Sequence, residues 1–158
     1  MPGPKDLKSL ASEPIFVPAS SSVKEAAQLM QRHFVGSLVV EGPDGDPIGL
    51  VTDRDLALGA LTRPPGTSAP TVQSLASTPL LTLPADSTVP DATRFLGAHC
   101  VRRVGLTDEK GALVAVLSSD VLLMYLGTQI HRLTVTISRE FQEEKHPTTP
   151  PGSIFGSE

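Results

Sequence analysis

The feature that most constrains this chain is an internal repeat, which appears when the sequence is shifted against itself by 66 residues. Residues 17–23 then align with residues 83–89 without a gap, and His33 aligns with His99. A segment just upstream, residues 9–14, matches residues 74–79 at an offset of 65. Each half has only about sixty residues and would bury too little apolar surface to be comfortably stable alone. We therefore expect the two halves to pack together.

Both halves predict the same order of elements, β-α-β-β-α, and so an α+β fold made of tandem repeats. The first half has predicted strands at 15–17, 37–40 and 47–51, and predicted helices that begin after Ser22 and cover 53–61. The second half repeats this with strands at 80–83, 104–106 and 112–117, and helices that begin after Thr88 and cover 119–127. The first helix of each half starts with a hydroxyl residue followed three positions later by an acid, which is the pattern of a capping box.

The repeat also sets the expected boundaries. We assign residues 1–64 to the first repeat, 65–71 to a linker rich in Pro and Gly, and 72–129 to the second repeat. Residues 130–145 form a C-terminal extension, which either continues a helix or adds a strand, since residues 133–137 alternate in polarity. Residues 146–158 contain three prolines and two glycines, and we predict that they form a disordered tail.

Charge and cysteine content exclude several classes of protein. The 158 residues include 13 basic and 17 acidic side chains, with a formal net charge of −4 and no basic cluster. This composition argues against binding of duplex nucleic acid, which needs a basic face. The single cysteine, Cys100, excludes a disulfide within the chain, and the longest apolar run, residues 121–126, is too short to cross a bilayer. We expect a soluble, cytoplasmic protein with no insertion into membranes.

The repeat and two short motifs together resemble a pair of CBS domains, known as a Bateman module. The motifs are Gly-Leu-Val-Thr-Asp-Arg-Asp at residues 49–55 and Val-Arg-Arg-Val at residues 101–104, and the resemblance covers about residues 5–128. It implies that the repeats pack as a pseudo-two-fold pair and leave two clefts that can hold adenine nucleotides such as AMP, ADP or ATP. It also implies a homodimer that acts as a ligand-sensing regulator of a protein partner and is not an enzyme.

The resemblance assigns roles to residues around one cleft. A carboxylate can accept hydrogen bonds from both hydroxyls of a ribose, and Asp55 is the candidate, with Thr52 and Asp53 beside it at the start of a helix. A phosphate needs cationic donors, which Arg102 and Arg103 of the other repeat could supply. Because these two arginines are adjacent on a strand, they should point to opposite faces. The adenine would contact the aliphatic side chains of Ile15, Val17 and Val39.

A second interpretation of the same motif needs no ligand. Thr52 followed by Asp55 is itself a helix-capping pattern, in which the threonine caps the helix and the acid lies in its first turn. If capping is its entire role, the chain is a ligand-free structural module for dimerisation or protein interaction. Both interpretations remain open from the sequence.

The second cleft lacks the residues that the first retains. A shift of 66 residues places Val121 at the position of Asp55, and places Gly36 and Ser37 at the positions of the two arginines. Asp120 lies one residue early and therefore on a different face of the helix. We expect one nucleotide per chain.

Three other features have competing interpretations. His99 and Cys100 could take part in a metal site, although few further ligands are in view. Asp53 and Asp55 resemble a catalytic carboxylate pair, but no nucleophile, metal set or glycine-rich phosphate loop accompanies them. The apolar run at residues 121–126 predicts either a dimer interface or a helix covered by the C-terminal segment.

Overall fold

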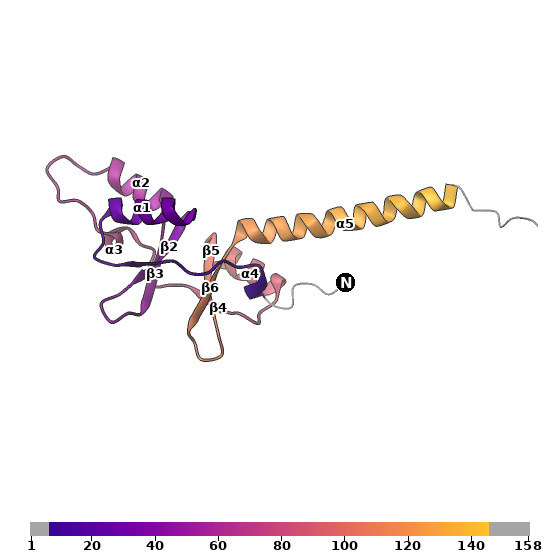
Figure 1. The fold of residues 1–158 in the computed structure, drawn as a ribbon, viewed down its shortest axis with the longest axis horizontal. Helices are drawn as coiled ribbons and strands as arrows, with labels where there is room; N and C mark the ends of the chain where they lie inside the picture. The colour runs from indigo at the N-terminus through magenta and orange to yellow at the C-terminus, as the bar shows by residue number, and fades with distance from the viewer. Residues whose placement is uncertain (1–6, 146–158) are drawn as a thin grey trace, which may run out of the picture. The chain divides into compact units, whose positions relative to one another are not determined.

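A computed structural model describes residues 7–145 and contains two three-stranded sheets (Figure 1). The first sheet consists of β1 (Phe16–Pro18), β2 (Ser37–Glu41) and β3 (Pro47–Thr52). The second consists of β4 (Thr82–Pro84), β5 (Arg103–Thr107) and β6 (Leu113–Ser118). In each sheet the first pair of strands is parallel and the second pair is an antiparallel hairpin. The predicted α+β fold of tandem β-α-β-β-α repeats is confirmed.

The central strand of each sheet is the most buried, because helices and neighbouring chain cover it on both sides. In β2 and in β5 the three middle residues are all buried, and this explains why both strands have continuous apolar or small residues instead of an alternating pattern. The two hairpin turns pass through Gly45 and Gly111, whose φ angles of 85° and 79° favour glycine.

The helices are α1 (Val23–His33), α2 (Asp53–Leu61), α3 (Val72–Leu75), α4 (Val89–His99) and α5 (Ser119–Lys145), preceded by a short 3₁₀ helix, η1 (Leu7–Ser9). The predicted bounds of α2 agree with the structure, whereas β1 and β4 end one residue later than predicted. The short helices η1 and α3 were not predicted, because they contain too few residues to show a helical period.

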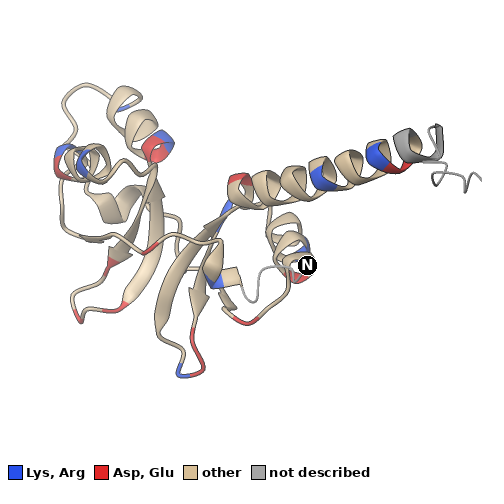
Figure 2. Ribbon diagram, turned by 45° about the vertical axis from the view of Figure 1, so that its right-hand side comes forward, with Lys and Arg blue, Asp and Glu red and all other residues tan. Residues whose placement is uncertain are grey.

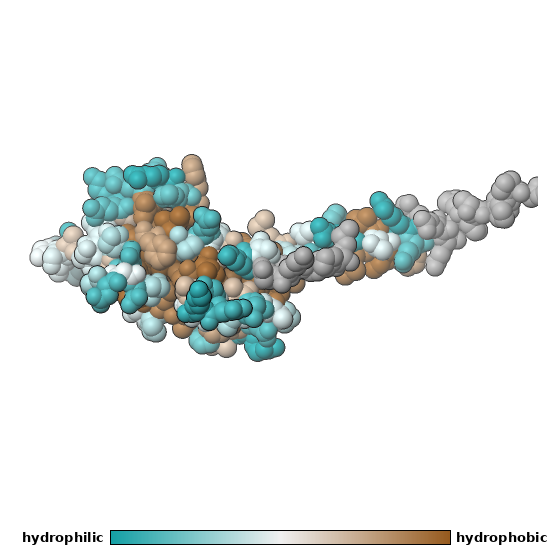
Figure 3. All heavy atoms as spheres, turned by 60° about the horizontal axis from the view of Figure 1, so that its bottom comes forward, coloured by the Kyte–Doolittle hydropathy of each residue, from teal (hydrophilic) through white to brown (hydrophobic). Residues whose placement is uncertain are grey.

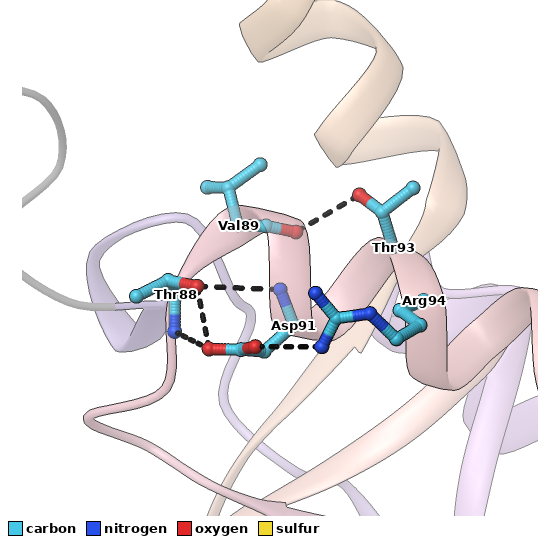
Figure 4. A network of polar contacts seen from close by, with 5 residues as sticks. All are labelled: Thr88, Val89, Asp91, Thr93 and Arg94. Atoms are coloured by element: carbon cyan, nitrogen blue, oxygen red, sulfur yellow. Dashed lines mark hydrogen bonds and ion pairs between the residues drawn. The ribbon is translucent and has the colours of Figure 1, made fainter.

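The capping boxes expected at α1 and α4 are present. Figure 4 shows the box of α4, in which Thr88 Oγ1 donates to Asp91 Oδ2 at 2.5 Å and the Asp91 N–H donates back to Thr88 Oγ1 at 3.3 Å. Asp91 also forms an exposed ion pair with Arg94 at 3.1 Å. These contacts satisfy donors that the first turn of a helix leaves free, and they fix where the helix begins.

The two hydrophobic cores exchange segments between the sequence halves. Leu7, from the start of the first half, is 1% exposed and packs in the core of the second half. Val72, from the start of the second half, is 0% exposed and packs in the core of the first half. The backbone makes the same exchange, because Ser12 bridges to Val116 and Leu50 bridges to Ser77. The sequence repeat therefore differs from the packing unit by one short segment at the start of each half.

The last helix settles the alternative left open for residues 130–145, since α5 continues without a break from Ser119 to Lys145. Residues Met1–Leu122 form one compact unit, and the chain from Leu123 onward forms a second. The tail predicted at residues 146–158 lies outside the described residues.

Charged residues are scattered over the described elements, including helix starts and hairpin turns (Figure 2). No helix within residues 7–145 combines the length and the apolar character that a bilayer-spanning segment requires.

Candidate functional site

The turn between α1 and β2 forms one wall of a cavity. α1 ends at Phe34, whose backbone is left-handed with φ 54° and ψ 41°. The chain then passes through Gly36 into β2. The Phe34 side chain is 95% exposed, which is unusual for a large apolar residue in a structured turn. Left-handed helix C-caps are usually glycine or asparagine, so the local backbone does not explain a phenylalanine here.

The cavity beside this turn has a volume of about 210 Å³, and both halves of the chain form its walls. Its lining residues are Ser12, Glu13, Ile15, Phe34, Val35, Gly36, Ser37 and Val39 from the first half, and Arg103, Val116 and Ser118 from the second. Among these residues Arg103 is the single cationic side chain and Glu13 the single acidic one. The site therefore combines apolar side chains with three serine hydroxyls and one charge of each sign.

Arg103 and Asp53 both approach Gly36 at the edge of the cavity. A Cβ atom on Gly36 would be 3.3 Å from Arg103 Nη2 and 3.5 Å from Asp53 Oδ2. The Asp53 N–H donates to the Gly36 carbonyl at 3.2 Å, so the start of α2 is held against this turn. Because Gly36 has no side chain, space remains between the guanidinium and the carboxylate.

Thr52 and Asp55 form a capping box at the start of α2. The Thr52 N–H and Oγ1 both donate to Asp55 Oδ2, at 2.8 and 2.7 Å, and the Asp55 N–H donates to Thr52 Oγ1 at 3.2 Å. Within residues 7–145 capping accounts for every side-chain hydrogen bond of this pair, and Asp55 Oδ1 accepts none. Neither residue lines the 210 Å³ cavity, although Thr52, the last residue of β3, pairs with Ser37, which does line it.

The same box occurs at two helix starts that lie outside the cavity lining. Hydrogen bonds from the backbone and hydroxyl of Ser22 lower the pKa of Glu25, and those from Thr88 lower the pKa of Asp91. The geometry at Thr52 and Asp55 is therefore a recurrent local structure in this chain and does not by itself indicate a ligand.

The other predicted site residues separate into two groups. Ile15, Val39 and Arg103 line the cavity. Val17 and Arg102 do not. Val17 is 2% exposed inside the core of the first half and does not face the cavity, so its contact with an adenine ring stays a prediction.

Arg102 makes a contact of its own. Its Nη2 donates to both carboxylate oxygens of Asp120, at 3.1 and 3.2 Å, with the two side chains 72% and 56% exposed. The two adjacent arginines thus have different surroundings, as expected for neighbours on a strand. An ion pair this exposed contributes little to stability.

A second cavity of about 170 Å³ occupies the position that the repeat relates to the first. It is lined by Leu50, Ser77, Thr78, Pro79, Leu80, Leu81, Val101 and Arg103. Its walls contain no carboxylate, and Arg103 is again its one cationic residue. At the position equivalent to Asp55, the Val121 N–H donates to Ser118 Oγ at 3.4 Å, so a backbone contact remains without an acid.

The sequence did not identify Phe34, Glu13 or Ser118 as lining residues. Glu13 belongs to the repeated segment 9–14, but it aligns there with Thr78, so the repeat itself does not mark it as a site residue. Its position in the cavity depends on the bridge between Ser12 and Val116, which joins residues more than a hundred positions apart. No local pattern specifies such a pairing.

The possible metal ligands have other contacts. His99 Nδ1 lies 2.9 Å from the Phe95 carbonyl oxygen, and its ring stacks on the Phe95 ring at 4.1 Å between centroids. Cys100 Sγ lies 3.7 Å from the Gly97 carbonyl oxygen. In the part of the chain that the structure describes, no three His, Cys, Asp or Glu side chains gather closely enough to hold a metal ion.

Comparison with known proteins relates this architecture to a family. Residues 5–59, which include the motif at 49–55, match the family model of the CBS domain. Residues 5–59 are a CBS domain. The second sheet and its helices repeat the same order of elements, and solved CBS-domain proteins share the fold of this chain across about three quarters of its length.

Three relatives illustrate the similarity of this CBS-domain pair to known proteins. An uncharacterised protein of Methanopyrus kandleri is 28% identical over 123 residues, which are 76% of this chain but 61% of that protein, so the chain spans less than two thirds of its relative. A CBS domain protein of Pyrobaculum aerophilum complexed with AMP is 23% identical, with a TM-score of 0.64 over 78% of this chain and 98% of the other. The CBS domain pair of protein MJ0100, in complex with 5′-methylthioadenosine and S-adenosyl-L-methionine, is 19% identical, with a TM-score of 0.67 over 78% and 97%.

Proposed function

We propose that this CBS-domain pair is a regulatory, non-catalytic module that binds an adenine nucleotide, AMP or ATP in type, in the 210 Å³ cavity. The observation that carries the proposal is the position of Arg103, a cation from the second half in a cavity otherwise formed mainly by the first half. The AMP, methylthioadenosine and S-adenosylmethionine in the two structural relatives share an adenosine group, which supports the choice of ligand class.

Each part of such a ligand has a candidate partner. Arg103 supplies a planar cationic donor for a phosphate, and the aliphatic side chains of Ile15 and Val39 form the apolar surface for an adenine ring. Asp55 Oδ1 is the candidate acceptor for the ribose hydroxyls, since Oδ2 already accepts both capping hydrogen bonds. Thr52 holds that carboxylate in place, and Asp53 approaches Gly36 as the phosphate-binding arginine does.

The size of the cavity suggests how binding produces a signal. Its 210 Å³ is below the roughly 300–1,000 Å³ of typical ligand pockets, so a nucleotide has to widen it. Because both halves line the cavity, widening it changes how the halves pack. The resulting shift is limited by the difference in ligand affinity between the two packings.

We propose one nucleotide per chain because the two cavities share Arg103. A phosphate that binds this guanidinium from the first cavity leaves the second without a cationic side chain in its lining. The second cavity also has no carboxylate at the position of Asp55. We further propose that the protein is a cytoplasmic homodimer whose ligand state is sensed by a protein partner.

Titration with AMP, ADP, ATP, GTP and S-adenosylmethionine tests the proposal by calorimetry and by thermal shift. A ligand at one hundred times its dissociation constant stabilises the fold by about 2.7 kcal/mol, which shifts the melting temperature by several degrees. We expect stabilisation by an adenine compound, with a stoichiometry of one per chain. A flat series with all five compounds would contradict the proposal and favour the ligand-free dimerisation or interaction module.

Two pairs of variants locate the site. Arg103→Gln should weaken binding by about ten-fold to a hundred-fold, the loss expected for a hydrogen bond to a charged group, whereas Arg102→Gln should leave binding unchanged. Asp55→Asn should weaken binding, whereas Asp91→Asn alters an equivalent capping box at the start of α4, which has no proposed ligand contact, and should affect only stability. If Arg102→Gln weakens binding as much as Arg103→Gln, Arg103 does not belong to the site. The same holds for Asp55 if Asp91→Asn weakens binding equally.

A further inference from the structure

Helix α5 carries a stripe of exposed apolar side chains over residues 123–141. Apolar atoms are visible at its surface in Figure 3. The side chains that form the stripe are 38–67% exposed and are those of Leu123, Leu126, Ile130, Leu133, Ile137 and Phe141. At 100° per residue they fall within an arc of about 80°. Arg132 and Arg139 lie on the opposite side of the helix, so this segment is amphipathic.

The spacing of the stripe is that of a coiled coil. From Leu123 to Ile137 the intervals are three, four, three and four residues, which is the heptad pattern. The a positions are then Leu123, Ile130 and Ile137, and the d positions are Leu126 and Leu133. Ile at a combined with Leu at d favours two parallel strands over higher oligomers.

The positions that flank this seam do not oppose association of identical helices. Within residues 123–137, Gly127 and Thr134 occupy e positions and Gln129 and Thr136 occupy g positions, so no like charges meet across the seam when two copies align in register. The next d position is Glu140, and the apolar seam therefore ends at Ile137. Thr134 Oγ1 donates to the Ile130 carbonyl at 3.0 Å, and Thr136 Oγ1 donates to the Arg132 carbonyl at 3.1 Å. Burial of either hydroxyl therefore leaves no donor unsatisfied.

We propose that residues 123–137 of α5 pair with the same residues of a second copy of this chain as a parallel two-stranded coiled coil. A helix face of this length is about 22 Å long and about 10 Å wide, or roughly 220 Å² per copy. Two such faces bury less than the 1,200 Å² or so that marks the lower limit of standard interfaces. The paired helices therefore form a contact that dissociates on dilution.

This inference assigns an interface to the proposed homodimer and does not depend on ligand binding. A chain that binds AMP and stays monomeric would overturn the inference and leave the ligand proposal intact. A dimer that binds no nucleotide would contradict the ligand proposal and leave this inference intact.

Sedimentation velocity of the full chain from about 1 µM to several hundred micromolar tests the interface. We expect the unmodified chain to shift from monomer to dimer as its concentration rises. The double variant Ile130→Glu, Leu133→Glu should remain monomeric, because it places charges at one a and one d position. Val135→Glu is the matched control, since Val135 is 39% exposed on the same helix but lies outside the seam, and it should dimerise normally. Glutamate favours helix, and circular dichroism should show that α5 persists in all three proteins.

Disulfide crosslinking tests the parallel arrangement. In a Cys100→Ser background, Leu126→Cys should form a disulfide-linked dimer under mild oxidation, because a parallel seam places the two copies of residue 126 together. Val135→Cys should not. A dimer that fails to crosslink through residue 126 would overturn the parallel arrangement.

Two further outcomes would overturn the proposal. One is a monomer at every concentration, and the other is a dimer that the double variant leaves intact. The alternative use of the stripe is tested by flotation with vesicles of phosphatidylcholine and phosphatidylglycerol. A monomeric chain that floats with these vesicles would assign the stripe to a membrane surface instead.

Discussion

Phe34 adopts a backbone conformation that suits glycine or asparagine, and it does so beside the proposed ligand cavity. The repeat places Cys100 at the equivalent position, with nearly the same φ of 53°. A left-handed conformation costs an ordinary L-residue about 1–2 kcal/mol, so both residues reduce the stability of the fold. Phe34 differs from Cys100 because it lines the 210 Å³ cavity. Because Phe34 keeps an exposed aromatic ring in an unfavourable backbone conformation beside the cavity, we expect this ring to contact the ligand.

This contrast yields a prediction for two matched variants. Phe34→Asn and Cys100→Asn should each raise the free energy of unfolding by about 0.5–1 kcal/mol, because asparagine tolerates the left-handed cap. Only Phe34→Asn should also weaken nucleotide binding. Urea denaturation and calorimetric titration measure the two effects. Unchanged affinity in Phe34→Asn would exclude Phe34 from the ligand contacts.

At the scale of single residues, the sequence predicted what short-range contacts decide. The capping boxes at Ser22 and Thr88 join residues three positions apart, so the pattern alone specifies their geometry. The role of Asp55 is less determined, because the same box forms with or without a ligand nearby.

At the scale of elements, β3 is crossed by the segment that leads into the second half. Leu50 and Ser77 exchange two backbone hydrogen bonds, at 3.1 and 2.8 Å. This close approach requires Gly49. A Cβ atom there would lie 2.5 Å from the Ser77 carbonyl oxygen and 2.8 Å from Thr78 Cγ2. Since one of these neighbours is backbone, it cannot move away by a change of rotamer.

We expect Gly49→Ala to destabilise the protein by about 1–3 kcal/mol, the usual range for overpacking. Gly97→Ala is the matched control, because nothing lies within 4 Å of a Cβ at that position in α4. Alanine there should stabilise the helix by about 0.5–1 kcal/mol. Urea unfolding gives both values. Equal stability of Gly49→Ala and the unmodified protein would mean that the crossing segment can shift freely.

At the scale of the whole molecule, the exchange of segments couples the two cores. The core of the first half is incomplete without Val72, and the core of the second is incomplete without Leu7. Each half therefore depends on residues that the other half's sequence repeat supplies. This arrangement predicts that residues 7–122 unfold as one unit.

Two core variants test this coupling. Leu7→Ala should destabilise the fold by about 2–5 kcal/mol, and Val72→Ala should also destabilise it, because both side chains are fully buried. Each variant should shift one common transition, seen both by circular dichroism and by hydrogen exchange at β2 and β5. Two separate transitions, each sensitive to only one variant, would contradict coupled cores.

The sequence by itself determined the repeat, the order of elements, the helix caps and the hairpins, because all of these follow from contacts between residues close together in the chain. It also contained the heptad spacing of residues 123–137, although the alternation at 133–137 left a strand possible over that shorter stretch. Continuity with the helix that starts at Ser119 decided between the two.

Only the tertiary structure decided which core each short segment joins and which side chains reach the cavity. Val17 and Arg103 show this most clearly. Both were candidates on equal grounds, yet Val17 is buried in a core while Arg103 from the other half lines the cavity. These outcomes depend on the bridges from Ser12 to Val116 and from Leu50 to Ser77. Such pairings join segments far apart in the chain, and their stability comes from burial shared by both halves, which no local pattern of residues encodes.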